Sequence, residues 1–260
     1  MTKDVFKESR YGRIHLRVTG EGRPLFLMHS VARSGQEFDA LASELQNEFR
    51  VVAWDMPGHG DSDPILRHIT VSAYADLAAD LIGDIFGDNR PIVGGSSLGA
   101  MLSLALGARH PNAAAAILPI EMPLGRDEAW WRANWSTVET LFGLPDEDEE
   151  RVRARFRDWS PELATRLRMD RFRAGARAIM DVLWAGREES DDVPGWVRSL
   201  GLPTLFVNGD RGVAPKAREL LAEFNPAVRL TIIADSGHFP QTDDPAAVAA
   251  AIRDWAATIG

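Results

Sequence analysis

Short runs of apolar residues alternate with longer amphipathic segments along this chain. Because short apolar runs bounded by turn residues are typical of buried parallel strands, they predict strands at residues 13–18, 25–28, 51–54, 91–94, 114–120, 204–208 and 230–234. Pro119 predicts an early end for the fifth of these strands. Helices are expected at residues 36–49, 71–86, 100–109 and 246–257. The last helix has Asp244 and Pro245 as its N-cap and first residue. This alternation predicts an α/β fold with a mostly parallel central sheet and helices on both faces.

The stretch between Met122 and Leu202 interrupts this alternation, because it contains no convincing strand. We expect residues 122–200 to form a helical cap that is inserted into a core of residues 1–121 and 201–260. The stretch holds most of the eight tryptophans of the chain, at positions 130, 131, 135, 159, 184 and 196.

Most of these tryptophans are expected to form the core of the cap itself. Trp130 and Trp131 follow the strand at 114–120 most closely, so they are the expected substrate-binding pair. The arginines at 151, 153, 155 and 157 are expected to lie on a solvated helix, with capture of a substrate carboxylate as the alternative.

Composition and charge narrow the classes of function. The 260 residues are 45% apolar and 26% charged, as in an ordinary globular enzyme, and the net charge of −9 argues against nucleic acid as a main partner. The absence of cysteine excludes disulfides, cysteine nucleophiles and thiolate metal sites. The first residues lack the apolar stretch of a signal peptide, and no apolar run is long enough for a membrane span. We therefore expect a cytoplasmic protein with a small-molecule substrate and no membrane partner. The oligomeric state is left open by the sequence.

The segment Gly95-Ser96-Ser97-Leu98-Gly99 is a G-x-S-x-G motif between a predicted strand and a predicted helix. A sharp turn of this kind exposes the hydroxyl of its central serine and directs the N-terminus of the helix at it. Ser97 is therefore the candidate nucleophile. Serine chemistry also needs a base, a carboxylate that orients the base, and backbone N–H groups that stabilise an oxyanion.

His238 is the candidate base. It follows the strand at 230–234, so it is expected at the same carboxyl edge of the sheet as Ser97, where the chemistry of open α/β sheets collects. His29 follows the strand at 25–28, where the oxyanion loop belongs, and we expect it near the substrate. The expected oxyanion donors are the backbone N–H groups of Val31 and Leu98.

Taken together, these segments resemble an α/β-hydrolase-fold protein. The matching stretches are MHSV at 28–31, DMPGHGDS at 55–62, GSSLG at 95–99 and SGHFPQTDDP at 236–245, in family order over nearly the whole chain. The resemblance implies a hydrolase that needs no cofactor and no metal, and it leaves the substrate open. The family usually has glycine after the histidine of the oxyanion loop, where this chain has Ser30.

Two carboxylates are candidates for the acid of the triad. In most of the family the acid lies beyond the strand that here is 204–208, usually three residues after a glycine; that position holds Gly212, and Asp210 lies two residues earlier. The rival is Glu121, just after the strand at 114–120, a placement that resembles the haloalkane and haloacetate dehalogenase branch. Because an unpaired carboxylate at a buried strand end would be costly, we favour Glu121 over Asp210.

The type of nucleophile then separates two kinds of chemistry. Those dehalogenases use an aspartate, because a carboxylate that attacks an alkyl carbon leaves an ester that water can cleave, whereas a serine would leave an inert ether. Ser97 is suited to attack a carbonyl carbon and form an acyl-enzyme. We predict hydrolysis of a small carboxylic ester or lactone. The alternatives are C–C bond hydrolysis of a ring-cleavage product and a hydrolase-fold ligand receptor.

Overall fold

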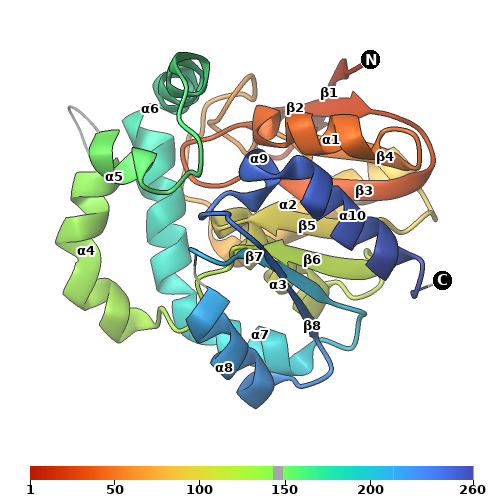
Figure 1. Ribbon diagram of the computed structural model, residues 1–260. Coiled ribbons are helices and arrows are strands. Elements are labelled where there is room, and N and C mark those ends of the chain that lie inside the picture. The colour runs from red at the N-terminus through yellow and green to blue at the C-terminus, as the bar shows by residue number, and fades with distance from the viewer. Residues whose placement is uncertain (143–148, 213, 260) are drawn as a thin grey trace.

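The computed structural model describes residues 1–142, 149–212 and 214–259, and these form an eight-stranded sheet with helices on both faces (Figure 1). The strands are β1 (Lys3–Ser9), β2 (Gly12–Thr19), β3 (Arg23–Met28), β4 (Phe49–Trp54), β5 (Ile92–Ser96), β6 (Ala116–Ile120), β7 (Leu205–Gly209) and β8 (Arg229–Ile233). Their order across the sheet is β1-β2-β4-β3-β5-β6-β7-β8. β2 runs antiparallel to both of its neighbours, β1 and β4, and every neighbouring pair from β4 across to β8 is parallel. The predicted α/β fold is confirmed.

The helices of the two layers enclose separate apolar clusters. They are η1 (Gly35–Phe38), α1 (Asp39–Leu45), α2 (Val71–Phe86), α3 (Leu98–Arg109), α8 (Ala214–Phe224), α9 (Pro240–Asp243) and α10 (Pro245–Ala256). Side chains of α1 and α10 pack on one face of the sheet, and those of α2, α3 and α8 pack on the other. As predicted, the Asp244 side chain accepts a hydrogen bond from the Ala247 N–H and begins α10.

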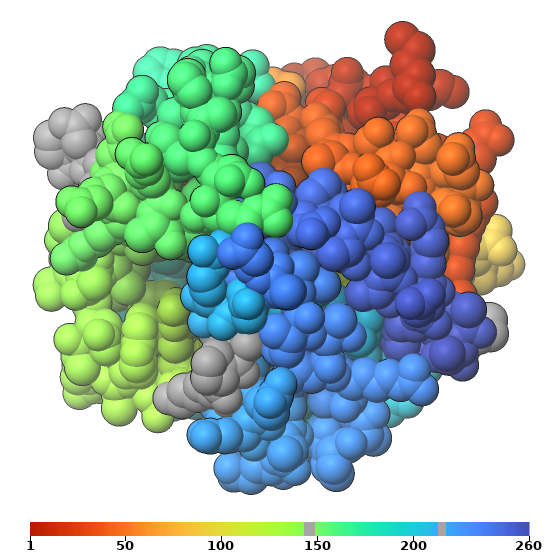
Figure 2. Space-filling view, viewed as in Figure 1, coloured from red at the N-terminus to blue at the C-terminus, as the bar shows by residue number. Residues whose placement is uncertain are grey.

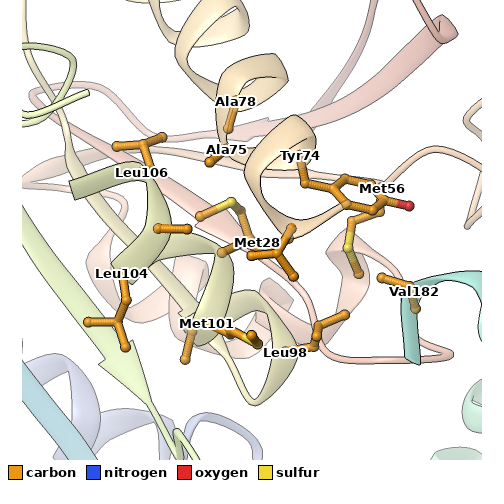
Figure 3. Packing of buried hydrophobic residues seen from close by; sticks show 14 of the residues in the cluster. Met28, Met56, Tyr74, Ala75, Ala78, Leu98, Met101, Leu104, Leu106 and Val182 are labelled. Atoms are coloured by element: carbon orange, nitrogen blue, oxygen red, sulfur yellow. The ribbon is translucent and has the colours of Figure 1, made fainter. Parts of the chain in front are cut away.

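Figure 3 shows part of the apolar cluster on the α2 and α3 face of the sheet, where it packs against the end of β3, the strand that leads to the candidate oxyanion loop. Met28, the last residue of β3, lies between Tyr74 and Ala75 of α2 and Met101 and Leu104 of α3. Burial of an apolar side chain of this size contributes roughly 1.5–3 kcal/mol. This packing fixes the end of β3 against the beginning of α3, where the site is built.

Three details differ from the sequence-based expectations. β1 lacks an apolar run because it is an edge strand whose side chains are exposed or half-buried. The helix expected at 36–49 ends at Leu45, since Phe49 already pairs with Arg23 in the parallel ladder of β3 and β4. β6 continues through Pro119, because it pairs there with β5, whereas its pairing with β7 is confined to few positions.

Between β6 and β7 the described residues form helices and no strand. These are α4 (Glu128–Phe142), α5 (Glu149–Arg153), α6 (Pro161–Glu188), η2 (Ser190–Asp192) and α7 (Val193–Ser199). Figure 1 shows α4, α5 and α6 beside the sheet rather than on either face of it. α6 is broken at Gly175, whose φ of 65° costs a glycine little. α7 packs against α3 of the sheet layer. Over the described part of the chain, no helix has both the length and the apolar character that crossing a bilayer requires.

Candidate active site

Ser97 alone makes the turn between β5, which ends at Ser96, and α3, which begins at Leu98. Its φ of 54° and ψ of −110° are costly for a residue other than glycine. The Ser97 N–H donates to the Ile120 carbonyl at 2.9 Å, and its own carbonyl accepts from the Ala100 N–H at 3.1 Å. These bonds to β6 and to the first turn of α3 hold the strained turn at the carboxyl edge of the sheet.

The two glycines of the motif are required by close packing. A Cβ on Gly99 would lie 2.0 Å from the Met28 carbonyl oxygen, and a Cβ on Gly95 would lie 2.3 Å from the backbone of Gly99. Neither position could hold a side chain unless β3 or α3 moved. The glycines therefore let α3 start directly against the end of β3.

Glu121 lies against the ring of His238, with 3.1 Å between Oε2 and Nδ1. Glu121 follows β6 directly, is completely buried, and has a φ of 50°. Its N–H donates to the Val207 carbonyl at 2.9 Å, and its Oε1 accepts from the Gly209 N–H at 2.7 Å. The backbone of β7 thus fixes the carboxylate, and the second oxygen faces the imidazole.

Asp210, the other candidate acid, is engaged elsewhere. Its carboxylate accepts from the backbone N–H groups of Asp235 at 2.9 Å and Ser236 at 3.1 Å. These hydrogen bonds, that from Asp235 first, lower the pKa of Asp210. Asp210 therefore shapes the loop that leads to His238, and it is Glu121 that the structure brings to the ring.

Burial and positive charge act together on His238. Burial lowers the pKa of its imidazole well below the usual 6.5, and the charges of Arg155, Arg126 and Arg33 lower it further. The backbone N–H of His238 donates to the Arg155 carbonyl at 2.9 Å, which joins the His238 loop to the segment after α5. An imidazole kept neutral in this way can accept a proton.

The turn after β3 carries the expected oxyanion donor Val31. In place of the usual glycine, Ser30 donates from its N–H and its hydroxyl to Glu37 Oε2, at 3.1 and 2.6 Å. Within the described residues, the backbone N–H groups of Val31 and Leu98 donate to no other group. Both residues line the same cavity as Ser97.

His29 is brought to a different place from the one expected. Its ring is completely buried, with Nδ1 at 2.7 Å from the Ser30 carbonyl oxygen and Nε2 accepting from the Met56 N–H at 2.9 Å. Among the residues that the structure describes, it does not line the cavity. The expectation that His29 contacts substrate is therefore corrected: Nδ1 contacts the neighbouring residue of its own loop, and Nε2 ties the end of β3 to the turn after β4.

A cavity of about 620 Å³ lies between the carboxyl edge of the sheet and helices α4, α6, α7 and α8. Ser97 and His238 both line it, as do Trp130 and Trp131, whose rings pack edge to face at 5.3 Å. Figure 2 shows the face on which α4, in yellow-green, and α8, in blue, border this region. Most of the lining is apolar, so the cavity suits an organic ligand that presents a reactive group to Ser97.

Comparison with known proteins gives the family of this arrangement. The profile of the alpha/beta hydrolase family matches residues 25–251. The chain is similar to a pimeloyl-[acyl-carrier protein] methyl ester esterase of Stenotrophomonas maltophilia, with 31% identity over 95% of this chain and 97% of that protein. It is also similar to a 2-(acetamidomethylene)succinate hydrolase of Mesorhizobium japonicum, with 26% identity over 94% of this chain and 92% of that protein. The solved structure of an N-acyl homoserine lactonase superposes with a TM-score of 0.75 at 21% identity, over 100% of this chain and 98% of that one, and so shares the fold.

Proposed function

Because this chain belongs to the alpha/beta hydrolase family, we propose that it is a serine hydrolase that cleaves a small carboxylic ester or lactone through an acyl-enzyme. The observation that carries this proposal is the 3.1 Å contact between His238 Nδ1 and the buried Glu121 carboxylate. His238 also lines the same cavity as Ser97. Ester cleavage is also the activity in the name of the relative at 31% identity.

In this mechanism Glu121 orients the ring and stabilises the imidazolium, which leaves Nε2 of His238 to act on Ser97. Nε2 takes the proton of the Ser97 hydroxyl while Oγ attacks the carbonyl carbon. The backbone N–H groups of Val31 and Leu98 stabilise the tetrahedral oxyanion. His238 then gives its proton to the departing alkoxide, which leaves the acyl group on Ser97.

Deacylation uses the same groups. His238 removes a proton from a water molecule, and the resulting hydroxide attacks the acyl carbon. The tetrahedral intermediate expels Ser97 Oγ, which takes the proton back from His238, and the free acid departs. Although the acid follows β6 as in the dehalogenase branch, a serine nucleophile favours carbonyl over alkyl carbon, because only an acyl-serine is readily hydrolysed.

The test is turnover combined with labelling of the nucleophile. We expect a fluorophosphonate to label Ser97 and to abolish multiple-turnover hydrolysis of p-nitrophenyl acetate, and Ser97→Ala to lower kcat by roughly a millionfold. Esterase activity that survives Ser97→Ala would refute the proposal. Labelling without multiple turnover of any ester, accompanied by ligand-induced thermal stabilisation, would favour a receptor instead. Faster turnover of a dienol-ketone than of simple esters would favour C–C bond hydrolysis.

A further inference from the structure

Arg126 is a cation in the wall of the cavity. It follows Glu121 by five positions, in the connection between β6 and α4. Its side chain lines the cavity together with Ser97 and His238. Its guanidinium lies over the ring of Trp130, 4.4 Å from the ring centroid. The face of the indole ring attracts such a cation and helps to keep it in the cavity wall.

Among the residues that the structure describes, none provides the guanidinium of Arg126 with an ion pair. In the described part of the chain, no carboxylate lies within ion-pair distance of it and no acceptor receives its N–H groups. Arg187, by contrast, is paired with Glu128 at 3.0 Å. Glu121 favours the charged form of Arg126 from a greater distance, and its carboxylate is already held by His238 and the β7 backbone.

Arg126 is half-buried in the cavity wall. Its partial burial lowers the pKa of the guanidinium to about 10, which still leaves the side chain charged at neutral pH. A partly desolvated cation without a counter-ion costs free energy, and an anionic ligand that pairs with it recovers part of that cost. Arginine recognises carboxylates with two parallel N–H···O bonds, so a carboxylate is the anion that best suits this position.

The other charged groups in the cavity wall are compatible with a bound anion at this position. Arg155 and Arg211 also line the cavity, and Arg211 is paired with Asp235 at 2.9 Å. Asp127 lines it too, but its Oδ1 accepts from the Trp130 N–H at 2.7 Å at the beginning of α4. Glu223 of α8 is exposed.

We infer that Arg126 binds a carboxylate on the substrate, so that the ester or lactone that Ser97 attacks carries a second, free acid group. A half-ester of a dicarboxylic acid is the simplest such substrate. This inference rests on the proposed ester hydrolysis and assigns the substrate class to the same cavity. Arg126 then selects the substrate by pairing with a group that does not react.

Two esters of equal chain length test this selection. Monomethyl adipate carries a terminal carboxylate where methyl hexanoate carries a methyl group. We expect a higher kcat/KM for the adipate ester. At a pH well above 6.5, where His238 is neutral with or without the Arg126 charge, we expect Arg126→Gln to lower it by roughly tenfold to a hundredfold while kcat/KM for the hexanoate ester changes little. Arg132→Gln is the matched control, because Arg132 is exposed on α4 and the same charge is removed. It should change neither rate.

The contrary results are equally specific. Equal losses for both esters in Arg126→Gln would mean that Arg126 acts through Glu121, and equal wild-type rates would mean that the cavity ignores the acid group; either overturns the inference. Calorimetric binding of adipate to Ser97→Ala separates this inference from the proposed function. If adipate binds and Arg126→Gln abolishes that binding while no ester is hydrolysed, the proposed function fails and the carboxylate site stands. If adipate does not bind, the carboxylate site fails even where methyl hexanoate is hydrolysed.

Discussion

The carboxylate of Glu121 occupies the space beside Gly212 that a side chain at that position would need: a Cβ on Gly212 would lie 2.3 Å from Glu121 Oε1 and 2.4 Å from Oε2. Position 212 is where the sequence pattern of most of the family has its acid, and here the carboxylate reaches the same volume from the end of β6. A side chain at 212 and the carboxylate of Glu121 therefore exclude each other. This exclusion explains why the usual acid position holds a glycine.

Gly212→Ala is expected to displace the Glu121 carboxylate from His238. Displacement of a catalytic group by about 1 Å costs on the order of 100-fold in rate, so kcat for a simple ester should fall by about that factor. Gly201→Ala is the control, because a Cβ there meets nothing within 4 Å. Steady-state kinetics and thermal unfolding of both variants separate a local effect from a loss of fold. A Gly212→Ala enzyme with wild-type kcat would show that the carboxylate is not needed at this place.

The choice between the two acids is tested by charge removal at constant shape. Glu121→Gln should lower kcat by roughly 10³- to 10⁴-fold, because the imidazolium loses its carboxylate and the ring its orientation. Asp210→Asn should leave kcat nearly unchanged and lower the thermal stability, since Asp210 holds backbone N–H groups of the His238 loop. Small and equal losses of kcat in both variants would exclude either residue as the acid.

The fold could be predicted because its central strands are mostly buried. β3 and β7 each contain a short apolar run, at residues 25–28 and 205–207, which local sequence reveals directly. β1 could not be found in this way, because an edge strand that buries little needs no apolar run. The end of α1 was also missed, since the pairing of β4 with β3 determines where that helix must stop.

In the candidate site, too, residues in local sequence motifs could be predicted, whereas residues that depend on contacts between distant segments could not. Ser97 and His238 each sit in a local motif, so sequence was sufficient to nominate them. The choice between Glu121 and Asp210 could not be made from sequence, because the contact between Glu121 and His238 joins residues 117 positions apart, and because Gly212 leaves the space that the Glu121 carboxylate occupies. His29 follows the predicted strand, but its position there does not determine where its ring points. Arg126 carried no sequence signal, and only its place in the cavity wall distinguishes it.

A buried hydrogen-bond network around Glu37 of η1 joins the turn after β3 to α9 and to the end of β5. Glu37 accepts two hydrogen bonds from Ser30 and one from Gln241 Nε2 at 2.8 Å, and Gln241 also donates to the Ser96 hydroxyl at 3.0 Å. In Glu37→Gln an amide NH₂ group, which cannot accept a hydrogen bond, replaces one of the two accepting oxygens and faces a donor. We therefore expect a loss of about 1–3 kcal/mol in the free energy of unfolding and a lower kcat.

Urea unfolding measures the first effect, and steady-state kinetics the second. Glu44→Gln removes the same charge from an exposed position of α1 and should change neither quantity. Unaltered stability in Glu37→Gln would mean that water or a neighbouring group satisfies the donors as well as the carboxylate does.

The pH profile tests the positive surroundings of His238. Burial, and then Arg155, Arg126 and Arg33, hold the pKa of the imidazole well below 6.5. Because the base must be neutral to accept a proton, kcat/KM for methyl hexanoate, which does not ionise, should stay level as the pH falls through 6.5 and decline only at lower pH. The free energy of unfolding should already decrease as the pH falls from 6.5 toward the lowered pKa of the folded protein. In that range the unfolded chain binds a proton at His238 and the folded chain does not.

Arg155→Gln should move the acidic limb of kcat/KM to higher pH. The substitution removes a positive charge that disfavours the imidazolium, so the pKa of His238 rises, while the backbone carbonyl that accepts from the His238 N–H is retained. Arg153→Gln removes the same charge from an exposed position at the end of α5 and should leave the limb in place. A wild-type limb with its midpoint at or above pH 6.5, or a limb that Arg155→Gln leaves unmoved, would contradict the electrostatic account. In the first case the Glu121 carboxylate would outweigh both burial and the arginines, and His238 would be protonated earlier than its surroundings predict.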